Sequence, residues 1–206
     1  MKYFVFTAGV LQTNSILLQE GRECVVVDIP YGSQDLEKFV EKNNLTVRAV
    51  LLTHGHFDHC GGVTHFAKAC RCPNVPVLAN ERDWELCLHA SQNRWGVPCD
   101  DCVPNGRLQE GGLVLGNLHF EILETPGHTG GSVVILANDL MLSGDTLFRN
   151  GVGRTDFPES VGAQMTISLQ KLATLPGDYT VICGHGEQTT LKREKSNNGW
   201  LLHLEQ

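Results

Sequence analysis

Short apolar runs separated by polar turns dominate the first part of the chain. Residues 3–6, 14–19 and 24–30 are rich in β-branched and aromatic side chains and are bounded by glycine, asparagine or Glu-Gly. Each run therefore predicts a strand. The period then changes, because apolar residues recur at helical spacing in 33–44, behind Ser33, a residue type that favours the N-cap. This stretch predicts an amphipathic helix.

A dense group of histidines follows the next apolar run. Residues 47–53 predict a buried strand, residues 54–59 hold three histidines and an aspartate, and residues 61–72 predict a helix. This order of strand, loop and helix is typical of a βαβ-type unit. Active residues in such units commonly lie at the carboxyl ends of strands.

Further strands and helices alternate along the remainder of the chain. Residues 70–106 are the least regular part, with a helix expected near 81–90. Two β-to-α halves in succession predict an α/β protein with two mixed sheets. Because no linker or short repeat interrupts the sequence, we expect a single domain over residues 1–206. The other expected elements are strands over 113–126, 131–138, 139–145 and 179–186 and a helix over 159–176.

Charge and composition narrow the classes of function. The net charge of −7 argues against a nucleic-acid binder, whose affinity rests on Lys and Arg contacts to phosphates. The first residues lack the pattern of a secretory signal, and no window approaches the roughly 18 apolar residues of a membrane span. We therefore expect a cytoplasmic protein, monomeric or homodimeric. Its partner should be a small-molecule substrate rather than nucleic acid or a membrane.

Eight cysteines are many for a cytoplasmic chain. They lack the regular spacing of a disulfide framework, so we expect reduced thiols. Cys70, Cys72, Cys99 and Cys102 form two close pairs in the sequence and could hold a structural metal. The alternative is a thiol-rich loop region without a metal.

The histidine-rich segment has the residue types and spacing of a metal site. In an extended segment, the side chains of His54, His56 and Asp58 share one face, and His59 joins them only if the loop curls. Neutral imidazoles with a carboxylate suit zinc, iron or manganese. The alternative is a polar loop with capping side chains.

Three distant residues are candidates to complete such a site. His128 lies in a glycine-rich turn between predicted strands, and Asp145 and His185 each follow an apolar run and a glycine. Asp145 alone could be a turn or N-cap residue. Their shared placement at strand ends or in turns favours a common site.

These motifs together resemble the metallo-β-lactamase fold superfamily. They are H-x-H-x-D-H at 54–59, P-G-H-T-x-G-S at 126–132, G-D-T-L-F at 144–148 and G-H-G at 184–186. Within the superfamily, the chain is similar to the short glyoxalase II-like, or hydroxyacylglutathione hydrolase-like, metal-dependent hydrolases. The resemblance implies a four-layer αββα sandwich, with two mixed sheets inside, helices outside and the metals at one edge.

The resemblance also implies a ligand set for two divalent metal ions, most simply zinc, with iron or manganese as alternatives. Two cations roughly 3.5–4 Å apart would lower the pKa of a bridging water, and the hydroxide would attack an ester-like carbon. The expected substrate is a thioester, S-lactoylglutathione or a related compound, because a leaving thiolate needs little protonation. The implied ligands are His54, His56 and His128 for one ion and Asp58, His59 and His185 for the other, with Asp145 shared.

The chain departs from full-length glyoxalase II after its metal domain. Only residues 186–206 follow His185, so we expect the helical region that binds glutathione to be absent. An acidic tripeptide could still be bound by a cation, and Arg154 is the candidate substrate-binding residue. The other cations that could serve are Arg149, Lys192 and Arg193.

Residues 151–158, G-V-G-R-T-D-F-P, keep a second reaction open. Similar segments occur in the short hydrolases and in the persulfide dioxygenases of the same superfamily. A dioxygenase would use one iron held by His54, His128 and Asp145, whereas the G-H-G turn favours a hydrolase. A lactonase and a non-catalytic metal-binding module are further alternatives. Arg154 could also form a buried ion pair with Asp156 that fixes the loop.

Several further residues are expected to lie outside the site. The remaining histidines lack ligand neighbours in the sequence. Two tryptophans of the irregular region could cover the pocket, but packing is the expected role. One cysteine beside the ligands is expected to support them or to act sterically, and not to bind metal. These residues are His65, His89, His119 and His203, then Trp84 and Trp95, and Cys60.

Overall fold

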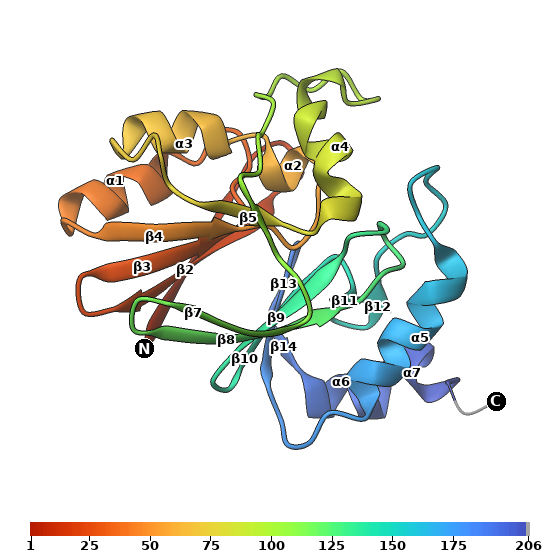
Figure 1. Cartoon of the computed structure of the whole chain (residues 1–206). Helices are drawn as coiled ribbons and strands as arrows, with labels where there is room; N and C mark the ends of the chain where they lie inside the picture. Colours follow the sequence, from red (N-terminus) through yellow and green to blue (C-terminus); the bar gives the residue numbers. More distant parts are fainter. Residues whose placement is uncertain (205–206) are drawn as a thin grey trace.

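Two six-stranded sheets pack face to face in the computed structural model, which describes residues 1–204 (Figure 1). The first sheet has the order β1-β2-β3-β4-β5-β6. Its strands β1, β2 and β3 are antiparallel neighbours, and β3 to β6 run parallel. The strand bounds are β1 Lys2–Ala8, β2 Thr13–Glu20, β3 Glu23–Val27, β4 Thr46–Leu51, β5 Val77–Ala79 and β6 Gly106–Arg107.

The second sheet is also mixed. Its order is β14-β13-β10-β9-β8-β7, and only the β10–β13 pair is parallel. A short two-stranded ribbon, β11 with β12, lies outside both sheets. The bounds are β7 Gly111–Leu115, β8 Leu118–Glu124, β9 Val133–Ala137, β10 Leu140–Gly144, β11 Leu147–Phe148, β12 Gly151–Val152, β13 Thr180–Cys183 and β14 Thr189–Thr190.

Helices cover the outer face of each sheet. In Figure 1, α1 and α3 lie over the first sheet, and α5, α6 and α7 lie over the second. A further group of short helical turns, η1, α4 and η2, follows β5. The bounds are α1 Gln34–Lys42, α2 Phe57–Cys60, α3 Val63–Ala69, η1 Glu81–Asp83, α4 Trp84–Leu88, η2 Ala90–Gln92, α5 Gly162–Ala173, α6 Leu191–Asn197 and α7 Gly199–Leu202.

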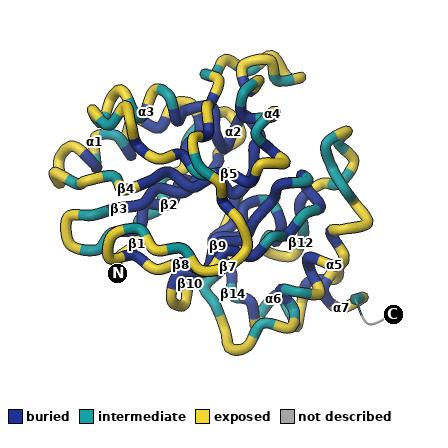
Figure 2. The backbone as a smooth tube through the Cα atoms, viewed as in Figure 1, coloured by how far each residue is buried: buried dark blue, intermediate teal, exposed yellow. Residues whose placement is uncertain are grey.

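The strand sequences explain why four layers form. Both faces of β3 are buried, so Cys24 and Val26 pack toward the helices while Val25 and Val27 pack toward the second sheet. The strand β9 does the same on the other side, with alternate residues in the central and the outer core. Three apolar layers therefore separate four structural layers, and Figure 2 shows the central strands of both sheets as mostly buried. The predicted αββα sandwich with two mixed sheets is confirmed.

Local details differ from the sequence predictions where single contacts decide the backbone. Ser33 occupies the N-cap position of α1, but its hydroxyl donates to Pro30 O at 2.7 Å and caps nothing. The strand predicted over 24–30 ends at Val27, because Asp28 has a positive φ of 55°. The helix predicted over 61–72 begins at Val63. A Cβ atom at Gly62 would lie 2.1 Å from Pro30 O, so this close approach requires glycine.

The elements that periodicity did not predict are short or terminal. β5, β6, β11, β12 and β14 have two or three residues each, which is too few for a period. The helices α6 and α7 lie near the end of the described part of the chain, where the sequence analysis predicted no element. None of the helices within residues 1–204 has the length and apolar character needed to cross a membrane.

Candidate metal centre

The seven candidate ligands lie at the ends of strands at one edge of the sandwich. His54 and His56 follow β4, and the one-turn helix α2 then carries Asp58 and His59. This turn is the curl that His59 needs to join its neighbours. From the second sheet, the β8–β9 turn supplies His128, and the ends of β10 and β13 supply Asp145 and His185.

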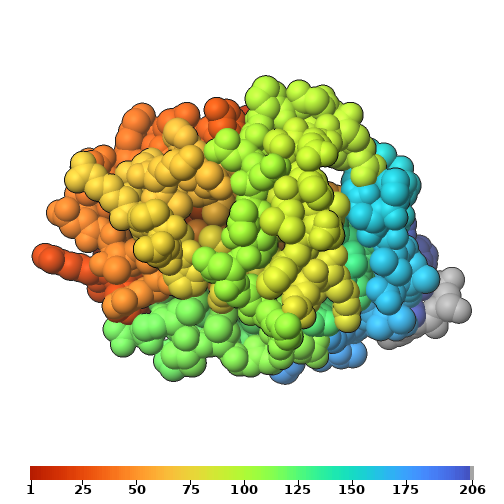
Figure 3. All heavy atoms as spheres, turned by 45° about the horizontal axis from the view of Figure 1, so that its top comes forward, coloured from red at the N-terminus to blue at the C-terminus, as the bar shows by residue number. Residues whose placement is uncertain are grey.

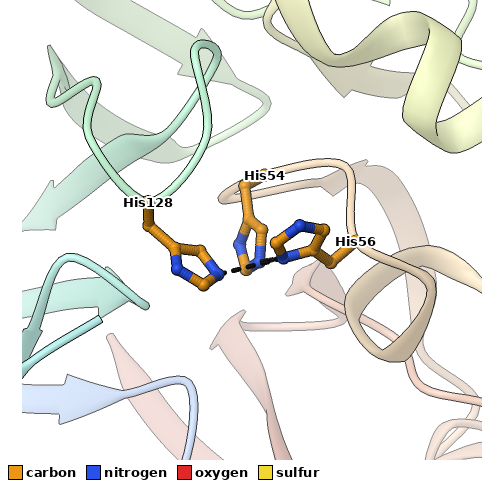
Figure 4. A group of neighbouring side chains, drawn as sticks. All are labelled: His54, His56 and His128. Carbon is orange, nitrogen blue, oxygen red and sulfur yellow. Dashed lines mark hydrogen bonds between the residues drawn. The ribbon is translucent and has the colours of Figure 1, made fainter. Parts of the chain in front are cut away.

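Three histidines converge on one point, and we call them the three-histidine group. His54 Nε2 lies 3.0 Å from His56 Nδ1, and His128 Nε2 lies 2.9 Å from the same atom. Figure 4 shows the three rings pointing toward one another from two different loops. All three side chains are buried, and their facing nitrogens are close enough to bind one ion.

Asp58, His59 and His185 form a second cluster, the mixed group. His185 Nε2 lies 3.3 Å from both His59 Nε2 and Asp58 Oδ2, and His59 Nε2 lies 3.6 Å from Asp58 Oδ2. These atoms are also close enough to share an ion. His59 is fully buried, whereas 26% of the His185 side chain is exposed.

Asp145 lies between the two groups. Its Oδ2 is 3.4 Å from His128 Nε2 and 3.5 Å from His185 Nε2, and its Oδ1 is 3.4 Å from His59 Nε2. Within residues 1–204, Oδ1 is buried and accepts no hydrogen bond. A buried carboxylate oxygen without a donor is costly unless a cation neutralises it. The carboxylate is therefore placed to serve both groups.

The outer nitrogen of every histidine in the two groups has a hydrogen-bond acceptor. Such partners fix the ring orientation and tautomer of metal ligands. With the outer nitrogen protonated, a neutral ring turns a lone pair toward its neighbours, which is the arrangement a cation needs. The pairs are His54 Nδ1 with Thr53 Oγ1 (3.1 Å), His56 Nε2 with Glu159 Oε1 (2.9 Å), His59 Nδ1 with Asp28 Oδ2 (2.8 Å), His128 Nδ1 with Arg154 O (2.8 Å) and His185 Nδ1 with Leu11 O (3.0 Å).

The two groups differ in their electrostatics. Burial, followed by the neighbouring His59 and His56, places the pKa of His54 well below its usual range. Burial also lowers the pKa of His185, but hydrogen bonds with Asp145 and Asp58 outweigh it and raise that pKa to about 9. The three-histidine group therefore offers neutral donors, whereas the histidines of the mixed group face the carboxylates of Asp58 and Asp145.

Asp28 is an organising residue that the sequence analysis placed within a strand. It accepts hydrogen bonds from Thr53 N at 2.8 Å and Thr53 Oγ1 at 2.7 Å, and also from His59. Since Thr53 donates its hydroxyl proton to Asp28, it must accept from His54 Nδ1. Asp28 thus orients a histidine of each group. An aspartate at the end of an apolar strand, the same signal as Asp145, could have identified it.

Asp83 is a second organising residue that the sequence analysis did not identify. It accepts from Gly55 N at 2.9 Å, Thr129 Oγ1 at 2.6 Å and Gly131 N at 2.8 Å. It therefore ties the loop of His54 to the turn of His128. No sequence signal marks it, because its partners lie far away along the chain.

A pocket of about 430 Å³ opens over both groups. Apolar side chains form most of its wall, and Arg154 is the one arginine or lysine among its lining residues. Arg154 pairs with Asp156 at 2.9 and 2.8 Å, but both side chains are about two-thirds exposed, so the buried ion pair expected here is wrong. The apolar lining residues are Leu11, Trp95, Phe148, Val152 and Phe157.

The other expectations for neighbouring residues had mixed outcomes. Trp84 packs against the core as predicted, but Trp95 is 48% exposed and lines the pocket. The Cys60 thiol faces Gly55 O, not the ligands. All eight cysteines are free thiols. Within residues 1–204, the only groups close enough to bind an ion consist of the seven candidates, so Cys70, Cys72, Cys99 and Cys102 form no second site and His65, His89, His119 and His203 lie outside.

Comparison with known proteins identifies the family. Residues 8–185 match the sequence model of the Metallo-beta-lactamase superfamily. The chain therefore belongs to the metallo-β-lactamase superfamily of metal-dependent hydrolases, as its motifs predicted.

Two relatives are similar over nearly their full length. The chain is 33% identical to a probable metallo-hydrolase, YqgX, of Bacillus subtilis, with 98% of each chain covered. It is also 33% identical to the hydroxyacylglutathione hydrolase GloC of Haemophilus influenzae, with 92% of each covered.

Two solved structures are similar to this chain over nearly their full length. The B3 metallo-beta-lactamase BLEG-1 superposes with a TM-score of 0.88 at 31% identity, covering 97% of this chain and 99% of that one. TTHA1623 in a di-iron-bound form gives a TM-score of 0.87 at 34% identity, covering 96% and 100%.

Proposed function

We propose that the protein is a binuclear metal-dependent hydrolase of small thioesters. One observation carries the proposal: the Asp145 carboxylate lies within 3.5 Å of both the three-histidine group and the mixed group. A carboxylate in this position suits a bridging ligand of two cations. The proposed ligands are His54, His56 and His128 for one ion, Asp58, His59 and His185 for the other, and Asp145 for both.

The donor types fit zinc, and iron or manganese as alternatives. Bound cations would supply Lewis acidity and a water that is nucleophilic near neutral pH. The protein's own contribution is orientation: the hydrogen bonds to the outer nitrogens of the histidines hold the donors in place, and the apolar wall excludes bulk water from the reacting carbonyl.

The lining of the pocket supports a thioester. Apart from the proposed ligands, Arg154 is the only titratable residue among those that line it, and an arginine does not give up its proton. No side chain there is therefore suited to protonate a leaving group. A thiolate leaves without protonation, whereas an amine does not, so the pocket favours thioesters over amides and lactams. The similarity to a hydroxyacylglutathione hydrolase supports the same class.

Arg154 is the proposed contact for an anionic part of the substrate. Its guanidinium lies over the Phe157 ring, with Cζ 4.5 Å from the ring centroid, at the wall of the pocket. Its pairing with Asp156 is exposed to solvent, so a substrate carboxylate can replace Asp156 at little cost.

Two other reactions use the same ligands differently. A persulfide dioxygenase would hold one iron with His54, His128 and Asp145. That arrangement leaves His56 unused, although its Nδ1 lies within 3.0 Å of both other histidines. A lactonase would need a protonated alkoxide leaving group, which the lining does not favour. The geometry supports the thioesterase best.

The test is a turnover panel on metal-free and reloaded protein. Hydrolysis of S-lactoylglutathione should disappear after chelation and return with zinc. Failure on this and other small thioesters, together with oxygen uptake in the presence of glutathione persulfide and iron, would replace the proposal with the dioxygenase. Hydrolysis of lactones alone would replace it with the lactonase.

A further inference from the structure

The segment 153–160 crosses the metal centre and touches two of the three histidines. Arg154 O accepts from His128 Nδ1 at 2.8 Å, and Ser160 Oγ donates to His128 O at 2.7 Å. The Phe157 ring packs edge-on against His56 and His128, with centroids 5.6 and 5.8 Å apart. The segment therefore forms an outer support of the three-histidine group.

Glu159 is the one carboxylate of this segment that reaches a ligand. Its Oε1 lies 2.9 Å from His56 Nε2, the nitrogen that faces away from the other histidines. The side chain of Glu159 is only 14% exposed and that of His56 only 8%. A carboxylate on the outer nitrogen of a histidine ligand orients the ring and makes it a stronger donor.

Arg94 holds Glu159 in place from the other half of the chain. Its Nη2 contacts both carboxylate oxygens of Glu159, at 2.7 Å from Oε1. The guanidinium Cζ also lies 5.2 Å from the centroid of the Trp95 ring and 5.1 Å from that of the Phe157 ring, within cation–π range. Figure 3 shows the segment around residue 94, in yellow-green, meeting the light blue residues near 159.

We infer that Glu159 is a positioning residue for His56, and that Arg94 holds it there through a contact between the two halves of the molecule. The inference rests on the binuclear site proposed above. It makes the ion of the three-histidine group dependent on a carboxylate that binds no metal. It also assigns a role to the irregular segment 70–106, which delivers Arg94 to the metal centre.

The test is metal affinity, measured by competition with a chromophoric zinc chelator on the full chain. Glu159→Ala should lower the binding affinity for one of the two zinc ions by about 10- to 100-fold. The affinity for the other should stay within about twofold of wild type. Glu159→Gln should recover part of the loss, because its amide oxygen still accepts from His56 Nε2. Arg94→Ala should give a smaller loss. Glu121→Ala and Glu121→Gln are matched controls, since this glutamate is exposed on β8.

Three results would overturn or redirect the inference. Affinities within twofold of wild type in Glu159→Ala would refute it. Equal loss of both ions in the alanine and glutamine variants, with a lower unfolding temperature, would assign Glu159 a purely structural role and refute it as well. If the wild type binds a single ion, the binuclear proposal fails. The inference then stands only if Glu159→Ala lowers the binding affinity for that single ion by about 10- to 100-fold.

Discussion

The histidines of the three-histidine group and those of the mixed group have pKa values shifted in opposite directions. In the first, burial lowers the pKa of His54, His56 and His128 and keeps their rings neutral. In the second, burial is outweighed by aspartates, which raise the pKa of His59 well above its usual value. A group of neutral imidazoles therefore lies beside a group in which imidazoles face carboxylates, and Asp145 is close to both.

The supports of the two groups differ as well. The three-histidine group is held by side chains from both halves of the chain, through Asp83 and Glu159. The mixed group is held by Asp28, which also reaches the three-histidine group through Thr53, and by the ends of β2 and β13. There Thr13 Oγ1 donates to Asp58 Oδ2 at 3.3 Å, and Asn14 N donates to Gly184 O at 2.8 Å. Substitutions of these supports should therefore affect the ion of one group more than the ion of the other.

Removing the shared carboxylate should have the largest effect. Asp145→Ala takes a ligand from both groups at once, so thioester turnover should fall by more than about 100-fold. A loss of about 100-fold is the upper effect of removing a residue that only hydrogen-bonds to a metal ligand. Elemental analysis should show well below two ions per chain. His65→Ala is the control, since His65 lies on α3 outside the site. Full metal content and turnover in Asp145→Ala would contradict the bridging role.

Removing a single ligand from either group should abolish the ion of that group alone. His56→Ala should lose the ion of the three-histidine group, and His185→Ala that of the mixed group, each retaining close to one ion per chain. Zinc titration followed calorimetrically would measure both. Normal activity in His56→Ala with one bound iron would favour the dioxygenase arrangement, in which His56 is not a ligand.

Among substitutions of residues that support the candidate ligands, Asp83→Ala should destabilise the metal-free protein the most. The change leaves Gly55 N, Thr129 Oγ1 and Gly131 N without their buried acceptor. The expected loss is about 3 kcal/mol in the free energy of unfolding, measured with urea. Asp156→Ala should leave the free energy of unfolding nearly unchanged, because its ion pair is exposed. Equal losses in the two variants would show that Asp83 does not connect the loops.

Asn14→Ala should have a smaller effect that is confined to the mixed group. Its Nδ2 donates to Cys183 O at 3.0 Å and to Gly186 O at 3.1 Å, on either side of His185. We expect a loss of about 1 kcal/mol in unfolding free energy, with a weakened ion at the mixed group alone. Weakening of the three-histidine ion instead would contradict the separation of the supports.

The layers and the candidate ligands could be predicted from the sequence because each has a local signal. Alternating or continuous apolar runs identify β3 and β9, and His128, Asp145 and His185 stand beside glycines at the ends of such runs. The resemblance to a family then joined these distant positions.

The supports of the ligands could not be predicted, since their roles exist only in three dimensions. Arg94 and Glu159 are separated by 65 positions in the sequence, and neither belongs to one of the motifs. The two-residue strands β11, β12 and β14 are likewise formed by pairing and not by periodicity. Ser33 had the right residue type for a cap, but the nearby Pro30 carbonyl accepts its hydroxyl proton.

The most direct test of the central claim is the metal content per chain, by elemental analysis of protein purified without added metal or chelator. Two divalent ions per chain, mostly zinc, are expected, because the two groups and Asp145 together provide four donors for each ion. A single iron per chain with little zinc would contradict the binuclear site and point to oxygen chemistry.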